Sequence, residues 1–265
     1  MKTTLWNHIQ KVKEQSPLVH NITNYVVMNS TANALLAVGA SPIMAHAPNE
    51  VNAMVAISHA LVVNIGTLDD FWLASMLQAA EQANLSGKPW VLDPVGAGAT
   101  DYRDTALQQL LQFKPTVIRG NASEIIALAQ KNTTQTKGVD STASSLDAVE
   151  AAQLLVAQFD TVVCISGATD IIVTKNETYF LDNGHAMMTK VTGLGCTATA
   201  LIGAFIGVVE NKTEATLAAM SLLAIAGQLG AVEVRGPGSL QVRILDYLYS
   251  LEEVTFYELL KIKKA

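Results

Sequence analysis

Charged residues and cysteines are scarce in this sequence. Asp, Glu, Lys and Arg make up 15% of its 265 residues, and its two cysteines are Cys164 and Cys196. The basic residues are scattered apart from KIKKA at the end, so the sequence has no basic stripe of the kind that binds nucleic acid. Two distant cysteines match no disulfide framework. We therefore expect a cytoplasmic protein that has no nucleic-acid partner.

Long hydrophobic runs are scarce as well. The longest uncharged apolar stretch, residues 194–209, is shorter than the roughly 20 residues that cross a bilayer. We expect its Gly203 and Gly207 to let a buried helix approach a sheet closely. The first residues, MKTTLWNHIQ, contain no apolar core like that of a signal peptide, so we expect no membrane partner. Half of the residues are nevertheless hydrophobic, which predicts a large core in a single domain over residues 1–265.

Short apolar runs alternate with helical patterns along much of the sequence. The runs are apolar on both faces, as the strands of a buried parallel sheet are. The expected strands are residues 60–66, 89–96, 115–121 and 160–167. The expected helices are residues 69–83, 106–111, 122–130, 145–158, 194–209, 213–232 and 239–250. This alternation predicts an α/β fold with a mostly parallel central sheet flanked by helices.

Two stretches interrupt this alternation. Residues 171–184 predict an antiparallel hairpin that turns at Asn176 and Glu177. Residues 131–145 are polar and poor in hydrophobic side chains, and they predict a surface loop or a mobile flap.

Polar residues and glycines follow the predicted strands at their carboxyl ends. In an open α/β sheet, ligands bind in the crevice beyond these ends. The residues concerned are Gly66, Thr67, Asp93, Gly96, Gly98, Arg119, Asn121, Glu124, Ser166 and Gly167. Two acids with one arginine suit a magnesium–phosphate ligand, because Mg²⁺ takes one or two carboxylates and arginine binds phosphate oxygens. The sequence contains neither a Walker A motif nor G-x-G-x-x-G, so a phosphate-binding site would belong to another class.

The segment TGLGC, residues 192–196, leads into a predicted helix that begins near Cys196. The free N–H groups and the positive dipole end of a helix start bind anions. Donors fixed on a developing charge matter most, because losing one typically costs about 10²–10³ in rate. A helix start also lowers the pKa of a thiol, so we expect thiolate character at Cys196.

Each candidate residue also has a purely structural explanation. Most free cysteines are small buried hydrophobic residues, and Cys196 could be one of them. Asp93 precedes a proline, and Asp-Pro commonly forms a turn. Glu124 could simply favour the first turn of its helix electrostatically, and Arg119 could be a surface ion-pair partner. The pattern of residues alone leaves these alternatives open.

Six segments spread from the N-terminal region to the helix after Cys196 resemble one known family. TGLGC itself is similar to the G-x-G-[DC] turn of ribokinase-like kinases, where most members have an aspartate in place of the cysteine. The six segments are VHNITNYVVMNSTAN (19–33), GASPIMAHA (39–47), VVNIGTL (62–68), VLDPVGAGAT (91–100), IRGNASEI (118–125) and VTGLGC (191–196). Together they narrow the resemblance to the hydroxyethylthiazole kinase family.

The resemblance implies a ribokinase-like three-layer sandwich and a specific activity. That activity is phosphorylation of the primary hydroxyl of 4-methyl-5-(2-hydroxyethyl)thiazole with ATP and Mg²⁺, in thiamine salvage or biosynthesis. It also implies a homotrimer with active sites at subunit interfaces. The implied residues are Met44, Gly193, Asn24, Val27, Gly66 and Thr67 for the thiazole, Arg119, Ser166 and Asn121 for the nucleotide, Asp93 and Glu124 for magnesium, and Cys196, Gly193 and Gly195 for catalysis.

Three other functions remain open at this point. Another ribokinase-like enzyme, such as a hydroxymethylpyrimidine kinase or the ATP-dependent dehydratase that repairs hydrated nicotinamide cofactors, is disfavoured by HNITN and SPIMAHA. A cysteine hydrolase would need a base near Cys196, and the nearest histidine in sequence, His185, lies across a predicted strand. A thiazole-binding regulator without catalysis would carry the same binding residues.

Overall fold

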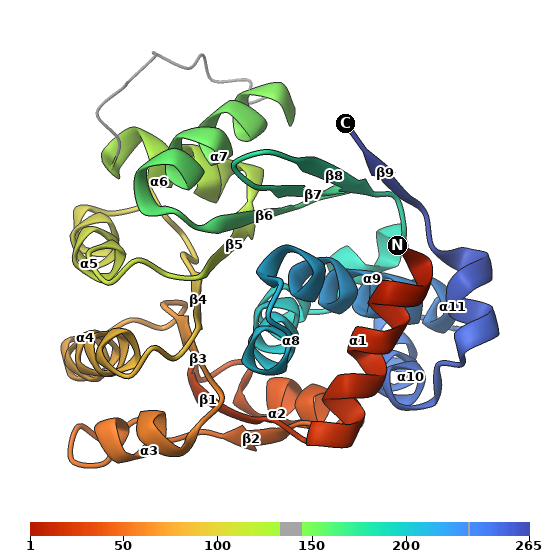
Figure 1. The fold of residues 1–265 in the computed structure, drawn as a ribbon, viewed down its shortest axis with the longest axis horizontal. Helices are drawn as coiled ribbons and strands as arrows, with labels where there is room; N and C mark the ends of the chain where they lie inside the picture. The colour runs from red at the N-terminus through yellow and green to blue at the C-terminus, as the bar shows by residue number, and fades with distance from the viewer. Residues whose placement is uncertain (133–144, 233) are drawn as a thin grey trace.

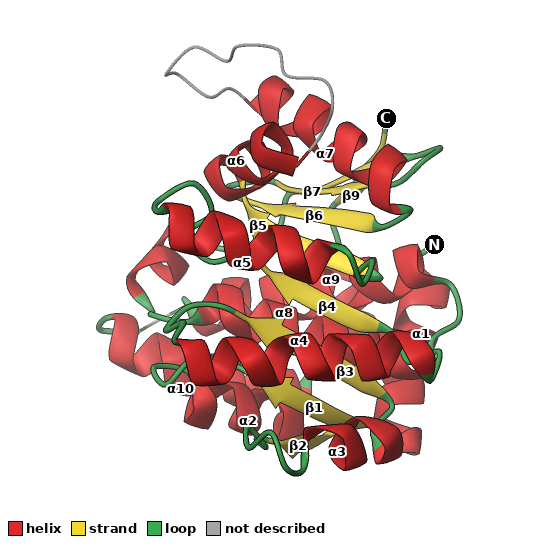
Figure 2. Cartoon of the chain, turned by 90° about the vertical axis from the view of Figure 1, so that its left-hand side faces the viewer, coloured by secondary structure: helices red, strands yellow, loops and turns green. Residues whose placement is uncertain are grey.

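The computed structural model describes residues 1–132, 145–232 and 234–265. Within them, one sheet has the strand order β2-β1-β3-β4-β5-β6-β7-β8-β9 (Figures 1 and 2). β1 to β6 pair in parallel, and β6 to β9 pair antiparallel. The strands are β1 (Leu18–Ile22), β2 (Ser41–Ile43), β3 (Ala60–Asn64), β4 (Trp90–Asp93), β5 (Val117–Asn121), β6 (Val162–Ser166), β7 (Asp170–Val173), β8 (Thr178–Leu181) and β9 (Ile262–Lys264).

Helices cover both faces of this sheet. Figure 1 shows α3 to α7 on one face and α1, α2 and α8 to α11 on the other. The helices are α1 (Lys2–Gln15), α2 (Met28–Ala37), α3 (Val51–Ile57), α4 (Asp70–Leu85), α5 (Asp101–Leu111), α6 (Ala122–Asn132), α7 (Ser145–Phe159), the 3₁₀ helix η1 (Ala186–Lys190), α8 (Leu194–Val208), α9 (Lys212–Gly230), α10 (Pro237–Ser250) and α11 (Glu253–Leu259). This three-layer arrangement confirms the predicted α/β class with a mostly parallel sheet.

The two faces of the sheet belong to two hydrophobic cores. Successive residues of a strand point to opposite faces, so Val62 of β3 packs in the core that contains Phe205 of α8. Its neighbour Val63 packs in the core that contains Met76 of α4. All five residues of β3 are therefore buried, which is why the strand is an unbroken apolar run.

Helix α8 lies against the centre of the sheet. Every residue from Thr197 to Ile206 is buried. A Cβ atom added to Gly203 would lie 2.5 Å from Cγ2 of Val62, so the expected close approach of this helix to the sheet is confirmed. None of the helices in the described part of the chain combines the length and the hydrophobicity needed to cross a membrane.

The predicted elements agree with the structure in position and order. The four expected strands are present as β3 to β6, and the expected hairpin is present as β7 and β8. The helix expected at residues 106–111 begins earlier, at Asp101, because the Thr100 side chain accepts a hydrogen bond from the backbone N–H of Arg103. The elements before residue 60 and after residue 250 had no sequence prediction. The loop expected at residues 131–145 lies, for residues 133–144, outside the described residues.

Candidate active site

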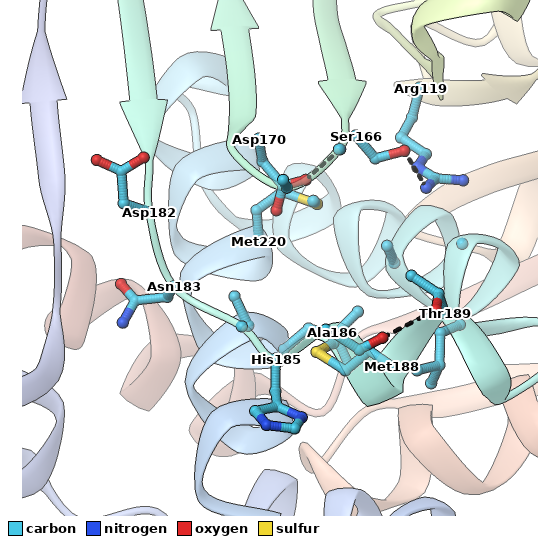
Figure 3. A pocket seen from close by; sticks show the side chains of 18 residues that line it. Arg119, Ser166, Asp170, Asp182, Asn183, His185, Ala186, Met188, Thr189 and Met220 are labelled. Atoms are coloured by element: carbon cyan, nitrogen blue, oxygen red, sulfur yellow. Dashed lines mark hydrogen bonds between the residues drawn. The ribbon is translucent and has the colours of Figure 1, made fainter. Parts of the chain in front are cut away.

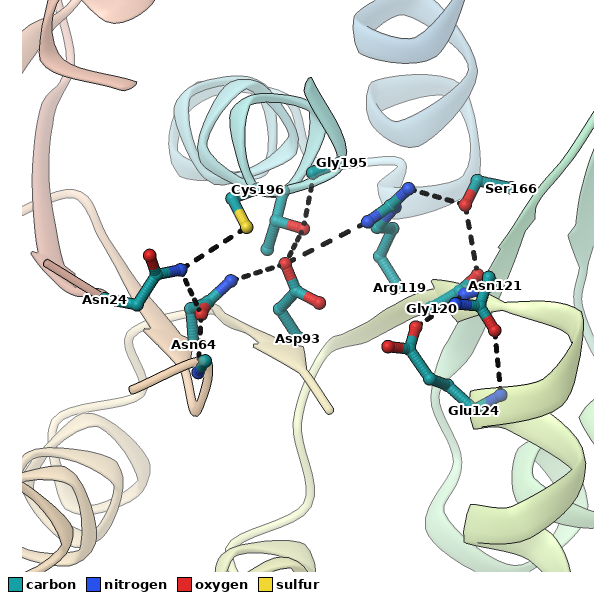
Figure 4. A network of polar contacts seen from close by, with 12 residues as sticks. Asn24, Asn64, Asp93, Arg119, Gly120, Asn121, Glu124, Ser166, Gly195 and Cys196 are labelled. Carbon is teal, nitrogen blue, oxygen red and sulfur yellow. Dashed lines mark hydrogen bonds and ion pairs between the residues drawn. The ribbon is translucent and has the colours of Figure 1, made fainter. Parts of the chain in front are cut away.

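The carboxyl ends of the parallel strands bring the predicted residues to one edge of the sheet. Asn24 follows β1, Gly66 follows β3, and Asp93 ends β4. Asn121 ends β5 and Ser166 ends β6, and these two residues pair in register. Figure 4 shows side chains from these strand ends in one polar network beside the first turn of α8. The structure therefore gathers residues that lie far apart in the sequence.

The first turn of α8 has the geometry of an anion site. Its N-cap residue Gly193 has a φ of 78°, in the left-handed region that favours glycine. No side chain caps this helix within the described chain, so the N–H groups of its first turn, at residues 194–196, have no helical acceptor. Val27 packs directly over Gly193, since a Cβ atom there would overlap Cγ1 of Val27.

Arg119 lies between the start of α8 and the ends of β4 and β6. Its Nη2 donates to Oγ of Ser166 at 2.5 Å, and its Nη1 lies 4.0 Å from Oδ2 of Asp93. The guanidinium fits against Gly195 so closely that a Cβ atom at that position would overlap it. These contacts are internal, which rules out the alternative that Arg119 is only a surface ion-pair partner.

Asp93 is buried and has one oxygen without a partner. Its Oδ2 accepts hydrogen bonds from Nδ2 of Asn64 at 2.7 Å and from Oγ1 of Thr199 at 2.8 Å. Its Oδ1 has no hydrogen-bond partner among the described residues. Burial raises the pKa of Asp93 to about 6, although the positive charge of Arg119 and the two hydrogen bonds oppose this rise. A buried carboxylate oxygen without a protein partner is commonly satisfied by an ordered water or an ion.

Glu124 stabilises the start of α6 and also contacts the loop after β4. Its Oε2 accepts from the N–H of Asn121 and the Asn121 side chain accepts from the N–H of Glu124, both at 2.9 Å, which forms a capping box at the start of α6. Its Oε1 accepts from the N–H of Gly96 at 3.0 Å. The charge of Glu124 also contributes to the raised pKa of Asp93, so the two acids lie close enough to interact.

The donor set suits a magnesium ion that arrives with a phosphate ligand. The described residues contain no group of three or more His, Cys, Asp or Glu side chains able to hold a metal by themselves. Mg²⁺ is commonly held by one or two carboxylates, with water and phosphate oxygens completing its shell. The unpartnered Oδ1 of Asp93, near Glu124, fits that pattern.

The prediction of thiolate character at Cys196 is wrong. Burial raises the pKa of this thiol, and the negative charge of Asp93 raises it further. Hydrogen bonds from Asn64 and Asn24 act in the opposite direction but are smaller causes. Nδ2 of Asn24 donates to Sγ of Cys196 at 3.4 Å. Since its pKa is raised from the ordinary value of 9.0, the thiol is neutral at physiological pH.

The residues expected to contact the thiazole lie around the ends of β1 to β3. Nδ2 of Asn24 donates to Oδ1 of Asn64 at 2.8 Å, and the N–H of Gly66 donates to the same oxygen at 2.9 Å. Oγ1 of Thr67 accepts from the N–H of Tyr25 at 3.1 Å. Met44 follows β2 at the same edge of the sheet and is half-buried.

A cavity of about 580 Å³ opens beside this network (Figure 3). Its lining includes Arg119, Ser166 and Gly195 from the polar network, together with the apolar side chains of Met188 and Met220. Among the described residues, its lining includes none of the side chains at the ends of β1 to β3. The cavity is therefore a separate compartment that meets the polar network at Arg119.

Three residues of this region were not found from the sequence. Asn64 and Thr199 hold Asp93, and Asp170 lines the cavity and accepts from the N–H of Gly167 at 3.0 Å. Asn64 lies within the segment VVNIGTL and at a strand end, so its position alone could have suggested it. Thr199 and Asp170 carry no comparable signal, because one is inside a helix and the other begins a hairpin strand.

Comparison with known proteins shows which family the sequence matches. The model of the hydroxyethylthiazole kinase family matches residues 9–254. A hydroxyethylthiazole kinase of Syntrophus aciditrophicus is 54% identical over 249 residues, which cover 94% of this chain and 92% of the relative. One of Vibrio atlanticus is 53% identical over 256 residues, which cover 96% and 97% of the two chains.

Solved structures agree with the sequence relatives. The hydroxyethylthiazole kinase protein of Pyrococcus horikoshii OT3 has a TM-score of 0.92 and 40% identity, with complete coverage of both chains. Staphylococcus aureus pyridoxal kinase in complex with pyridoxal has a TM-score of 0.64 at 16% identity, covering 94% of this chain and 98% of that one. The second likeness concerns the fold alone, and it confirms the ribokinase-like architecture.

Proposed function

The chain belongs to the hydroxyethylthiazole kinase family, and from that premise we propose that it uses ATP and Mg²⁺ to phosphorylate 4-methyl-5-(2-hydroxyethyl)thiazole in thiamine salvage. One observation carries this proposal. Arg119 and Gly195 line the cavity, and Nη1 of Arg119 lies 4.0 Å from Oδ2 of Asp93, whose other oxygen, Oδ1, has no hydrogen-bond partner among the described residues. A triphosphate entering from the cavity would meet a cation, a metal-holding acid and unpaired amides together.

The nucleotide occupies the cavity in this proposal. Arg119 and Ser166, which line the cavity, bind phosphate oxygens, and Asn121 lies beside Ser166 at the end of β5. Asp93 and Glu124 hold the magnesium ion, which neutralises charge on the phosphates. The amides of residues 194–196, which include those of Gly195 and Cys196, bind the transferring phosphoryl group.

The thiazole alcohol lies at the ends of β1 to β3, against Met44, Asn24, Val27, Gly193 and the Gly66–Thr67 loop. Its hydroxyl oxygen forms a bond to the γ-phosphorus while the bond from phosphorus to the β–γ bridging oxygen breaks, and ADP leaves with that oxygen. Because the thiol of Cys196 is neutral, it orients the hydroxyl through a hydrogen bond. The hydroxyl proton leaves late, to a phosphate oxygen, since phosphoryl transfer makes little demand for a strong base.

A homotrimer with active sites at subunit interfaces is part of the proposal. Beside the acceptor residues, large apolar side chains remain in solvent: Tyr25 is 62% exposed, Val26 is 63% exposed and Phe71 is 57% exposed. The ring of Tyr25 packs on that of Trp72 at a centroid distance of 4.4 Å, so this surface is ordered around an aromatic pair. A second copy that covers it would complete the acceptor pocket.

An ADP-release assay with the thiazole alcohol, with and without Mg²⁺, tests the proposal. We expect ADP only when the alcohol, ATP and Mg²⁺ are all present. Asp93→Asn should lower kcat by about 10²–10³. Asp160→Asn is the matched control, because Asp160 lies at the other end of the sheet, between α7 and β6. Tight thiazole binding without ADP formation would instead identify a regulator, and ADP formation only with a different alcohol would identify another kinase.

A further inference from the structure

Arg103, in the first turn of α5, binds three backbone carbonyl groups. Its Nη1 donates to the carbonyl oxygens of Ile65 at 2.6 Å and Val95 at 2.8 Å. Its Nη2 donates to the carbonyl oxygen of Gly66 at 2.9 Å. The Arg103 side chain also packs close to Gly96, where a Cβ atom would be 3.4 Å from Nε. One side chain thus contacts the backbone of two separate loops.

The two loops follow neighbouring strands and carry different parts of the site. The loop after β3 contains Gly66 and Thr67, which lie on the acceptor side. The loop after β4 contains Gly96, whose N–H binds Oε1 of Glu124. Arg103 therefore joins the backbone that faces the acceptor to the backbone that holds one of the two acids.

The chemistry of this contact requires an arginine. A guanidinium presents five donors in a rigid planar fork, whereas a lysine presents one point charge on a flexible stem. The rest of the first turn of α5 supports the same loop, because Asp104 accepts from the N–H of Gly98 at 2.8 Å. Arg103 is itself tied to the turn, since its N–H donates to the side chain of Thr100.

We propose that Arg103 is a positioning residue that fixes the acceptor loop, residues 65–67, relative to the loop of residues 95–98, which contacts Glu124. Arg103 acts on the reacting atoms indirectly, through the two loops that it holds. A displacement of about 1 Å between acceptor and phosphate can cost about 10²-fold in rate. This inference rests on the proposed function for the identity of the acceptor, whereas the contact between the loops is independent of it.

Hydrogen exchange tests the contact directly. In Arg103→Met, which keeps the aliphatic stem, the amides of Gly66, Gly96 and Gly98 should exchange faster than in the unmodified protein. The amide of Gly167, which is bonded to Asp170 on the cavity side, should be unchanged and serves as an internal reference. Arg243→Met is the matched control, because Arg243 lies on α10 and bonds Tyr247 on the same helix. Unchanged exchange in both loops of Arg103→Met would overturn the inference.

Steady-state kinetics tests the consequence. Arg103→Met should lower kcat/KM for the thiazole alcohol by about 10²-fold and leave the KM for ATP unchanged. Arg103→Lys should fall between this variant and the unmodified enzyme, and Arg243→Met should match the unmodified enzyme in both constants. Rates are referred to the folded fraction from thermal unfolding, so a loss explained by unfolding alone contradicts the inference. A rise in the KM for ATP contradicts it as well.

The two proposals fail in different ways. An unmodified protein that forms no ADP with the thiazole alcohol would refute the proposed function, while hydrogen exchange would still decide whether Arg103 holds the two loops. An active protein whose Arg103→Met variant keeps its full kcat/KM for the alcohol would refute only the role of Arg103.

Discussion

The side of the candidate site proposed to bind the nucleotide, called the nucleotide side, is lined by α8, α9 and the ends of β6 to β8. The side proposed to bind the acceptor, called the acceptor side, lies at the ends of β1 to β3 and leaves Tyr25, Val26 and Phe71 in solvent. The first side encloses a cavity of about 580 Å³ within one chain. The second side has its polar residues in place but exposes its apolar ones. This difference supports the proposal that one subunit binds the nucleotide alone, while a second subunit covers the acceptor pocket.

The two sides also differ in the groups that hold them together. Charged groups dominate the nucleotide side, where Arg119 interacts with both Asp93 and Asp170. Neutral amides dominate the acceptor side, where Asn24 and Asn64 bond each other beside Cys196. Changes on the nucleotide side should therefore act through charge, and changes on the acceptor side through position.

The largest expected effect belongs to Gly195→Ala. The added methyl group would overlap the end of the Arg119 side chain, which can move, so Arg119 should lose its contacts with Ser166 and Asp93. We expect kcat to fall by about 10²–10³. The thermal midpoint should be unchanged or higher, because alanine favours a helix over glycine by about 1 kcal/mol.

Gly238→Ala is the control for this change. Gly238 is also the second residue of its helix, α10, and a methyl group there meets open space. This variant should keep its full kcat. An unreduced kcat in Gly195→Ala would show that the contacts of Arg119 with Ser166 and Asp93 do not contribute to catalysis.

The second effect concerns stability and pH. Burial raises the pKa of Asp170 to about 6, with the Gly167 amide and Arg119 opposing the rise. The folded protein thus keeps this proton to a higher pH than the unfolded chain, so its stability falls as the pH rises from about 4 to 6 and stays lower above that. In Asp170→Asn, the fall in the free energy of unfolding between these pH values should be smaller by up to about 3 kcal/mol. Denaturant unfolding between pH 4 and 8 measures it, and parallel curves for the two proteins would contradict it.

The third effect should appear only on the acceptor side. Val26→Glu places a charge on the exposed apolar surface, so the proposed trimer should dissociate and the KM for the thiazole alcohol should rise about tenfold or more. The KM for ATP should stay unchanged. Light scattering after gel filtration and initial rates measure the two outcomes. Leu85→Glu is the control, since Leu85 is 78% exposed at the far end of α4. If Val26→Glu still forms a trimer and its KM for the thiazole alcohol is unaltered, the proposal that a second subunit completes the acceptor side is contradicted.

The smallest effect is expected for Cys196→Ala. A neutral thiol that only orients the hydroxyl contributes about one hydrogen bond, so kcat should fall about tenfold or less. A general base is worth about 10²–10⁴. A larger loss, together with a rate that rises as the thiol ionises at high pH, would make Cys196 a base. The Cys196→Asp variant, measured in parallel, shows whether an acid at this position can replace the thiol.

Much of the fold could be predicted because its central strands are unbroken apolar runs. The runs at β3 to β6 require burial on both faces, and the helices between them require a parallel sheet. That topology alone places Asp93, Asn121 and Ser166 at one edge. The first turn of α5 was missed because its residues are polar, and that turn carries Arg103.

The details of the site depend on packing that no local pattern encodes. Thr199 reaches Asp93 only because α8 lies against the sheet, and the sequence separation of the two residues is 106. The raised pKa of Cys196 comes from burial and from Asp93, whereas the sequence shows only a helix start. The prediction of thiolate character at Cys196 was therefore wrong because it left out long-range contacts.

A crystal structure of the enzyme with Mg²⁺, a non-hydrolysable ATP analogue and the thiazole alcohol tests the central claim most directly. The account predicts the γ-phosphate at the amides of residues 194–196, the metal beside Asp93 and Glu124, and the acceptor hydroxyl facing Sγ of Cys196. A triphosphate bound away from the start of α8, or a metal held by neither acid, would contradict it.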